Sequence, residues 1–286
     1  MSNSSPVKGK LRLAMTGVTT LVGQALLEAL AEQRDIQLFV VEEDEVDESH
    51  LDVGHVSEHL LPDELAAANC SALLLACEQP PAWALNCGCP LLPLWPAAGL
   101  DGALVAALEP LWQQLEGKLQ TLAMTVLWPM ATRQQPGIEE LVQQSASLLN
   151  GRGANPKLFP AQVAFNLSLG GGHGKPLADR LQLPITWLEA TAPLFFVTSV
   201  SLSLTSSEVL SLSQWRELIS AAGIKLPSPK RNRLSLVDEV SGQGGWHAAG
   251  LAVSGQQASL WLAGDLARAL LVEPALKLWR AGFGRG

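Results

Sequence analysis

The chain lacks the sequence features of several large protein classes. Among its 286 residues there is no Tyr, and only 16% of the residues are charged. Acidic residues outnumber basic ones, and the formal net charge is −8. This balance argues against nucleic acid or an anionic membrane surface as a partner. No uncharged apolar run reaches membrane-spanning length, and the first ten residues lack the apolar stretch of a signal peptide. We therefore expect a cytoplasmic protein with no membrane and no nucleic-acid partner.

Potential metal ligands are also scarce. The four cysteines lie in or beside apolar segments, and the five histidines are scattered. Cys87 and Cys89 form a Cys-x-Cys pair, but no second pair follows at the spacing of a zinc site. We expect no metal, and reduced cysteines in a packed core at Cys70, Cys77, Cys87 and Cys89.

The composition is that of a globular protein, with 48% hydrophobic residues and a length that suggests two domains. In residues 1–100, apolar strand-like segments alternate with helical patterns. An alternating strand around Leu11 is followed by an amphipathic helix, a strand over Ile36–Val41, a short helix with a third strand near 72–77, and a fourth strand within 86–95. This order predicts an α/β domain, a Rossmann-like doubly wound parallel sheet.

The pattern changes in residues 101–264. A long helix is predicted from Leu104 to Leu115 with Asp101 as its cap, then a strand over Leu119–Trp128 and a helix that ends at Asn150. Ser201 and Ser203 alternate with apolar residues in a further strand, so one face of that strand is expected to be exposed to solvent. A helix over 213–223 and strands over 247–253 and 258–264 complete an α+β domain with a mostly antiparallel sheet. Residues 265–286 form a third segment.

The most informative short stretch joins the first strand to the first helix. It reads TGVTTLVG, with Gly17 and Gly23 at the outer positions of a dinucleotide-binding turn and Thr20 at the middle one. Such a turn binds pyrophosphate because backbone N–H groups face the anion, but Thr20 brings a branched side chain into that space. A turn kept only for packing explains the same residues equally well. The candidate cofactor-binding residues are Gly17, Thr19, Thr20, Leu21, Val22 and Gly23.

The second strand ends in acidic residues, Glu42, Glu43 and Asp44. Carboxylates at this position accept hydrogen bonds from a ribose 2′-hydroxyl and repel a 2′-phosphate, so NAD is favoured over NADP if a cofactor binds. An acidic solvated loop is the equally simple alternative. No cofactor is predicted firmly.

Several segments in order resemble the aspartate-semialdehyde dehydrogenase family. They are TGVTTLVGQALLEAL, VAALEPLW, PGIEELVQQSASLLNG, LFPAQVAFNLSL, LPITWLEATAPLFF and LWLAGDLARAL, of which LFPAQVAFNLSL is the most specific. The resemblance implies a Rossmann-like domain, a dimer-forming α+β domain, and a C-terminal helix that returns to the first domain. It also implies a homodimer through the second domain.

Active members of that family use a cysteine thiolate to attack the aldehyde, transfer a hydride to NADP, and release the acyl group with phosphate. Counting back from Pro110 places their Asn-Pro-Asn-Cys turn on residues 96–99, so that Gly99 stands where the nucleophile is expected. Trp128 corresponds to the family glutamine, Thr191 to the substrate-binding arginine, and Thr198 to the general-base histidine. A threonine hydroxyl supplies neither the charge of arginine nor a base near neutral pH.

Loops of the family are also missing or changed. A phosphate-binding excursion is absent before the VAALEPLW helix, and a glycine-rich run, GGGHGK, replaces a substrate-binding helix after LFPAQVAFNLSL. We interpret that run as a deletion repaired by flexible glycines. Near the C-terminus, Leu270 stands at a family glycine position and Pro274 at an amide position.

Three functions remain open on this evidence. The first is a catalytically degenerate homologue that serves as a non-catalytic dimeric scaffold or regulator, with no catalytic residues. The second is an active NAD(P)-dependent aldehyde dehydrogenase of amino-acid biosynthesis that uses relocated residues. The third is an NAD-binding sensor without turnover. Fold alone does not choose among them.

Overall fold

The computed structural model describes residues 11–31, 33–44, 56–95, 97, 99–171, 174–228 and 231–283. The chain divides into two compact units. Unit 1 runs to Pro96 and resumes at Ala275, and unit 2 runs from Ala97 to Pro274. Each unit is described by itself.

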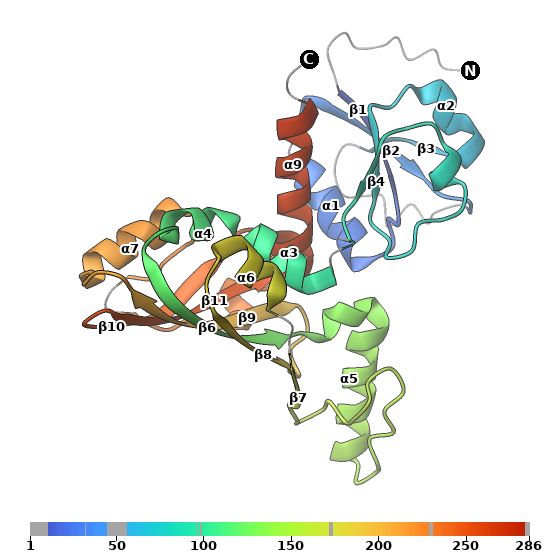
Figure 1. The fold of residues 1–286 in the computed structure, drawn as a ribbon. Helices are drawn as coiled ribbons and strands as arrows, with labels where there is room; N and C mark the ends of the chain where they lie inside the picture. Colours follow the sequence, from blue (N-terminus) through green and yellow to red (C-terminus); the bar gives the residue numbers. More distant parts are fainter. Residues whose placement is uncertain are drawn as a thin grey trace. The chain divides into compact units, whose positions relative to one another are not determined.

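Unit 1 contains a five-stranded sheet with the order β3-β2-β1-β4-β5, and every neighbouring pair is parallel (Figure 1). Its strands are β1 (Leu11–Thr16), β2 (Ile36–Val41), β3 (Val56–Leu60), β4 (Ala72–Leu75) and β5 (Leu91–Pro93). The chain moves outward from β1 to β3 and then restarts at β4 on the other side of β1. The order in which strands are added to the sheet therefore reverses between β1 and β4. Doubly wound folds bind their ligands in a crevice at this position. The predicted Rossmann-like fold class is confirmed.

Strand β3 was missed by the prediction, which placed the third strand at the position of β4. Its sequence, VSEHL, has polar residues at three of five positions, and it lies at the edge of the sheet next to β2 only. An edge strand needs little apolar surface, so hydrophobic patterning gives a weak signal for it.

The helices of unit 1 begin with α1 (Leu21–Ala31), as the apolar spacing predicted, and α2 (Leu65–Ala68). Helix α9 (Glu273–Phe283) enters unit 1 from Ala275 onward, and Arg280 on it donates a hydrogen bond to the Gln33 side chain. Short 3₁₀ turns lie at η2 (Pro62–Glu64) and η3 (Ala84–Asn86).

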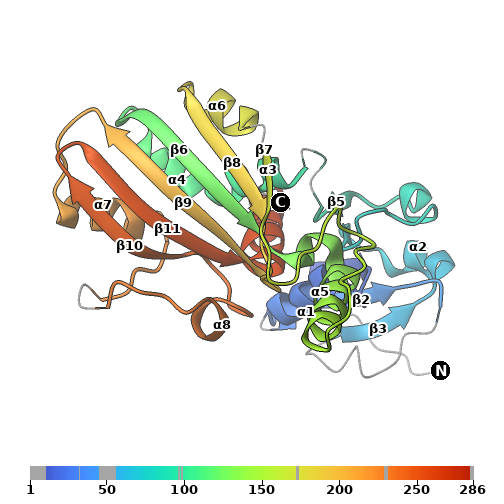
Figure 2. The ribbon, with the colours of Figure 1, turned by 90° about the horizontal axis from the view of Figure 1, so that it is seen from below.

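Unit 2 is built on a six-stranded sheet with the order β10-β11-β9-β6-β8-β7 (Figure 2). Its strands are β6 (Leu119–Trp128), β7 (Ser168–Gly171), β8 (Ile185–Thr191), β9 (Val197–Ser206), β10 (His247–Ser254) and β11 (Gln257–Asp265). Only β6 and β8 pair in parallel, and the other four pairs are antiparallel. The mostly antiparallel sheet is therefore confirmed.

One face of this sheet is covered by helices, whereas on the other only one end is covered, where the segment that leads into α8 (Leu236–Glu239) packs Leu234 and Leu236 near Ala263. Helices α3 (Gly99–Ala107), α4 (Glu109–Leu115), α6 (Lys175–Leu181) and α7 (Leu212–Ala221) lie on the covered face (Figure 1). On the opposite face, Ser203 and Trp261 are exposed, as the alternation in β9 predicted. We call this second surface the open face.

The long helix predicted from Leu104 to Leu115 is two helices. α3 ends at Ala107, Leu108 is buried between the helices, and α4 begins at Glu109 with Pro110 in its first turn. Proline lacks a backbone N–H and clashes with the preceding turn, so the chain breaks before it. Asp101 lies inside α3 and not at its cap, because α3 starts at Gly99.

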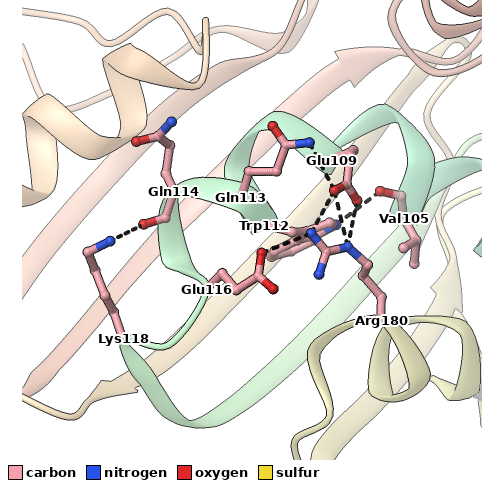
Figure 3. A network of polar contacts seen from close by, with 8 residues as sticks. All are labelled: Val105, Glu109, Trp112, Gln113, Gln114, Glu116, Lys118 and Arg180. Atoms are coloured by element: carbon pink, nitrogen blue, oxygen red, sulfur yellow. Dashed lines mark hydrogen bonds and ion pairs between the residues drawn. The ribbon is translucent and has the colours of Figure 1, made fainter.

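Helix α6 is tied to α4 by an ion pair. The Arg180 guanidinium donates to both carboxylate oxygens of Glu109, with its Nη2 2.7 Å from Oε1, and it lies 3.4 Å from Glu116 (Figure 3). The hydrogen bonds from Arg180 lower the pKa of Glu109. This pair holds the short helix that follows the glycine-rich run. Gly170 and Gly171 of that run belong to β7, whereas Gly172 and His173 lie outside the described residues.

Candidate functional site

The turn between β1 and α1 is held by close backbone packing. Gly17 has a φ of +83°, and a Cβ there would lie 3.0 Å from the Cys77 backbone nitrogen. A Cβ at Gly23 would lie 2.0 Å from the Gly17 carbonyl oxygen. Both glycines are therefore required by the backbone itself. Their presence does not by itself indicate a ligand.

Thr20 closes this turn with its side chain. Its hydroxyl accepts a hydrogen bond from the Gly23 N–H at 2.9 Å, as a helix N-cap does. The same oxygen lies 2.8 Å from the Gly17 carbonyl oxygen and 3.1 Å from that of Ala76, so its single proton is shared between these acceptors. The branched side chain was expected to project into the space of a phosphate. It is instead directed at its own turn.

The remaining predicted residues of the turn differ in exposure. Thr19 is exposed, Leu21 is half-buried, and Val22 is buried against the unit. In the described part of the chain, the backbone N–H groups of Leu21 and Val22 have no hydrogen-bond partner. They are the free donors expected in the first turn of a helix.

The sequence analysis named Glu42 but did not foresee that its side chain contacts the β1–α1 turn. Glu42 follows β2 directly, and its Oε1 accepts hydrogen bonds from the backbone N–H of Gly17 at 2.6 Å and of Val18 at 2.9 Å. The Thr16 hydroxyl donates to its Oε2 at 3.2 Å. The carboxylate was expected to face a ribose or solvent. The available signal was topological, since β1 and β2 are neighbouring parallel strands whose carboxyl ends meet at one edge.

Cys77 lies beside the same turn, directly after β4. Burial raises the pKa of its thiol, and the Glu42 carboxylate raises that pKa further. A protonated thiol is a poor nucleophile. The four cysteines are free and half-buried, and Cys70, Cys87 and Cys89 pack against the unit 1 core, as expected.

A second group of predicted residues meets at one end of the unit 2 sheet. Trp128, the last residue of β6, pairs in register with Thr191, the last residue of β8. Thr198 lies near the start of β9, which runs antiparallel to β6, and its neighbour Ser199 pairs with Leu127. The Ala192 N–H donates to the Trp128 carbonyl at 2.9 Å. Trp128, Thr191 and Thr198 therefore share one sheet end.

The side chains at this sheet end carry little reactivity. Trp128 is 8% exposed, and its indole N–H donates to Glu189 at 3.0 Å. Thr198 is fully buried, and its hydroxyl has no hydrogen-bond partner among the described residues. Neither side chain is a base or a cation. The sheet end has no group to accept a proton or bind a carboxylate at these positions.

The expected nucleophile position lies at the start of α3. Gly99 has a φ of +74°, and a Cβ there would meet nothing within 4 Å. Ala97 is described, whereas Pro96 and Ala98 of the same motif lie outside the described residues. All four cysteines precede residue 97, so unit 2 contains no thiol.

Gln134 is a residue that the sequence analysis missed. It begins α5 (Gln134–Leu149) with φ +55° and ψ −158°, a backbone region that is almost restricted to glycine. Both polar atoms of its side-chain amide are buried, without a hydrogen-bond partner in the described ranges. It follows the short turn η4 (Met130–Arg133), in which the Met130 N–H donates to the Leu194 carbonyl at 2.7 Å. The strained backbone of Gln134 therefore lies close in the chain to Trp128, at the end of the sheet that Trp128 shares with Thr191 and Thr198.

The LFPAQVAFNLSL segment is held by two side chains of α5. The buried Glu140 carboxylate accepts backbone hydrogen bonds from Lys157 at 2.9 Å and Leu158 at 2.6 Å. The buried Gln144 oxygen accepts from Val163 at 2.9 Å, and its amide nitrogen donates to Glu140 at 2.8 Å. Burial favours a raised pKa for Glu140, but these donors outweigh burial and lower it.

The two C-terminal positions singled out by the resemblance have structural roles. Leu270 is buried in the π-helix η5 (Leu266–Val272), and Pro274 lies in the first turn of α9. Asp265, the last residue of β11, caps η5: its carboxylate accepts hydrogen bonds from the N–H of Arg268 at 3.1 Å and from that of Gly242 at 2.9 Å.

Two further site classes were searched in the described residues. No group of three or more His, Cys, Asp or Glu side chains there is arranged to hold a metal ion. None of the helices within the described ranges is both long and apolar enough to cross a bilayer.

With this geometry in hand, the fold can be assigned by comparison. Aspartate semialdehyde dehydrogenase II from Vibrio cholerae superposes with a TM-score of 0.76 at 16% identity, over 96% of this chain and 99% of that chain. A probable aspartate-semialdehyde dehydrogenase from Pseudomonas aeruginosa gives a TM-score of 0.69 at 20% identity, over 96% and 99%. The chain therefore has the two-domain aspartate-semialdehyde dehydrogenase fold.

Two curated proteins are similar in sequence. A USG-1 protein homolog from Azotobacter vinelandii is 31% identical over 144 residues, which cover 44% of this chain and 42% of that protein. A USG-1 protein homolog from Pseudomonas aeruginosa is 30% identical over 136 residues, or 41% and 39%. The matched part spans about two-fifths of each relative. No family model matches the chain.

The resemblance in the sequence implies a nucleotide cofactor, and the geometry of the β1–α1 turn can be compared with that expectation. Phosphate oxygens bind such turns through backbone N–H groups. Here the N–H groups of Gly17 and Val18 already donate to a carboxylate, which would also repel an incoming phosphate. These residues do not fit a phosphate group on Gly17 and Val18, and we derive no chemical step through a cofactor.

Proposed function

We propose that this chain is a catalytically degenerate protein with the aspartate-semialdehyde dehydrogenase fold, acting as a non-catalytic dimeric scaffold or regulator. The observation that carries the proposal is the sheet end formed by Trp128, Thr191 and Thr198. There, a buried indole is hydrogen-bonded to Glu189 and a buried hydroxyl has no partner among the described residues. With Gly99 at the expected nucleophile position, the four positions that correspond to the family's catalytic residues supply neither a thiol nor an imidazole for acyl transfer.

The dimeric part of the proposal rests on the open face of unit 2. Its central residues are small or polar, and two large apolar side chains, Leu188 and Trp261, are exposed by 54% and 45%. A hollow of 610 Å³ lined partly by Thr186, Ser203 and Ser259 lies on this face. A two-fold pairing of open faces would cover the apolar residues and fill the hollow.

A turnover assay tests the loss of catalysis. Purified protein is mixed with aspartate semialdehyde, phosphate and either NAD or NADP, and the absorbance of the reduced cofactor is followed. We expect no increase above the protein-free blank, with an active aspartate-semialdehyde dehydrogenase as the positive control. Steady turnover that disappears when a single residue is replaced would contradict the proposal.

The Cys77→Ser variant makes this assay sharper. Cys77 is the thiol beside the turn, so an active enzyme with a relocated nucleophile would lose turnover in that variant. The proposal instead expects wild type and Cys77→Ser to be equally inactive. The name of the USG-1 relatives states no activity, so it favours neither outcome.

A further inference from the structure

The β1–α1 turn contains its own anion. We infer that Glu42 is a resident anion of this turn, and that it determines the turn's ligand preference by excluding phosphate-bearing nucleotides. The inference goes beyond the proposed function, because catalysis and phosphate recognition use different units of the chain. Its basis is the set of contacts that the Glu42 carboxylate makes.

Glu42 accepts from two backbone N–H groups of the kind that bind phosphate oxygens at strand–helix turns. Both N–H groups point at one oxygen, Oε1, from Gly17 at 2.6 Å and Val18 at 2.9 Å. The positive φ of Gly17 turns its own N–H and the following one toward the same side. The second oxygen, Oε2, accepts from the Thr16 hydroxyl at 3.2 Å. The turn therefore donates its converging hydrogen bonds to a residue of its own chain.

The charge of Glu42 is balanced by these dipoles. Within the described ranges it has no ion pair with Lys or Arg, and Arg12, which is near β2, stacks over the Phe39 ring at 4.9 Å. The negative charge is therefore available to repel a second anion at close range. A ligand phosphate on Gly17 and Val18 would have to displace the carboxylate, and a phosphate on the N–H groups of Leu21 and Val22 would be repelled by its charge on the same turn.

Replacement of Glu42 should release the turn. Glu42→Ala frees both N–H groups and removes the charge, whereas Glu42→Gln keeps an oxygen acceptor and removes only the charge. The adjacent Glu43 is exposed, so Glu43→Gln changes the net charge equally without touching the turn. Together the three variants separate occupation of the N–H groups from general electrostatic repulsion.

The experiment is isothermal titration of wild type and the three variants with NADP and, in parallel, with NAD. We expect wild type and Glu43→Gln to show no saturation with either ligand at concentrations on the order of 1 mM. We expect Glu42→Ala to bind NADP at least tenfold more tightly than that limit. Glu42→Gln should fall between them if charge contributes, and match wild type if occupation alone decides.

Two results would overturn the inference. One is wild-type binding of either dinucleotide within threefold of the Glu42→Ala affinity. The other is the absence of binding in a folded Glu42→Ala variant, because a released turn must accept the phosphate. Thermal unfolding establishes whether each variant is folded, and if Glu42→Ala is not, Glu42→Ser, whose side chain is two bonds shorter than that of Glu and also frees the N–H groups, takes its place with the same expected result. Turnover is assayed separately, so failure here leaves the proposed loss of catalysis unaffected.

Discussion

Single residues of the β1–α1 turn show how a nucleotide-like sequence can be explained by packing. Gly17 and Gly23 leave no room for a Cβ, and the Thr20 hydroxyl caps α1. A glycine-to-valine change at Gly17, which could otherwise serve as a binding test, would strain the backbone whether or not a ligand binds. Binding should therefore be tested at Glu42, where the backbone is not constrained.

The first prediction concerns Gly23. We expect Gly23→Ala to reduce the free energy of unfolding by about 2 kcal/mol or more, because its Cβ would lie 2.0 Å from the Gly17 carbonyl oxygen. The matched control is Gly282→Ala in α9, where a Cβ meets nothing within 4 Å. Better helix propensity should make that variant more stable by up to about 1 kcal/mol. Urea denaturation measures both, and equal effects would refute the packing explanation.

Gln134 provides the opposite case at the residue scale. We expect Gln134→Gly to raise the free energy of unfolding by about 1 kcal/mol, because glycine adopts φ +55°, ψ −158° without strain. The change also removes two buried amide atoms that lack partners among the described residues. Gln135→Gly, one residue further into α5, should instead lower stability by up to about 1 kcal/mol. Denaturation midpoints of the two variants on the same side of wild type would contradict this prediction.

At the scale of elements, the contacts between α5 and the 157–164 loop give a pH-dependent stability. The buried Glu140 has a lowered pKa in the folded state, so its contribution is present above its unfolded pKa, about 4.3. It is lost as the pH falls through the folded pKa. We expect Glu140→Gln to cost about 2 kcal/mol at pH 7.

This cost should shrink as the pH falls below about 4, because the wild-type carboxylate is then protonated too. Urea denaturation of wild type and Glu140→Gln between pH 7 and pH 3 measures the difference. Glu139→Gln, on the exposed side of the same helix turn, is the control and should show little pH-dependent difference. A cost for Glu140→Gln that stays constant over this range would show that its charge is unimportant.

The elements also show where sequence patterns succeed. Strands β2 and β6 have the predicted bounds, since β2 is a nearly continuous apolar run and β6 is a long strand in which buried and more exposed residues alternate from Leu122 onward. Strand β3 and the break at Leu108 were not predicted, because a polar edge strand and a proline inside an apolar helical pattern send conflicting local signals. The Trp128 and Thr191 positions came from the family resemblance, and their pairing required the β6–β8 register.

At the scale of the whole molecule, the proposed homodimer gives a testable prediction. We expect the protein in solution to have twice the chain mass of 30.4 kDa, measured by light scattering after size-exclusion chromatography. Ser203→Arg places a charge in the middle of the open face and should shift the protein to a monomer. Ser220→Arg, on exposed α7 over the covered face, should leave the dimer intact. A monomeric wild type, or an unaffected Ser203→Arg dimer, would exclude this interface.

The sequence by itself determined the change of pattern near residue 100 and the residue types present in each part of the chain. Hydrophobic period, glycine and proline positions are local properties of the chain, and the absence of cysteine after residue 89 is independent of folding. These features limited both the fold class and the chemistry available to unit 2.

Tertiary structure decided what the glycine turn does. Glu42 lies 25 residues from Gly17 along the chain, and only the parallel pairing of β1 and β2 brings its carboxylate to the turn N–H groups. The same holds for Thr198 and Trp128, whose shared sheet end depends on the antiparallel register of β6 and β9. Hydrogen bonds between distant residues depend on strand order and register, which local patterns do not encode.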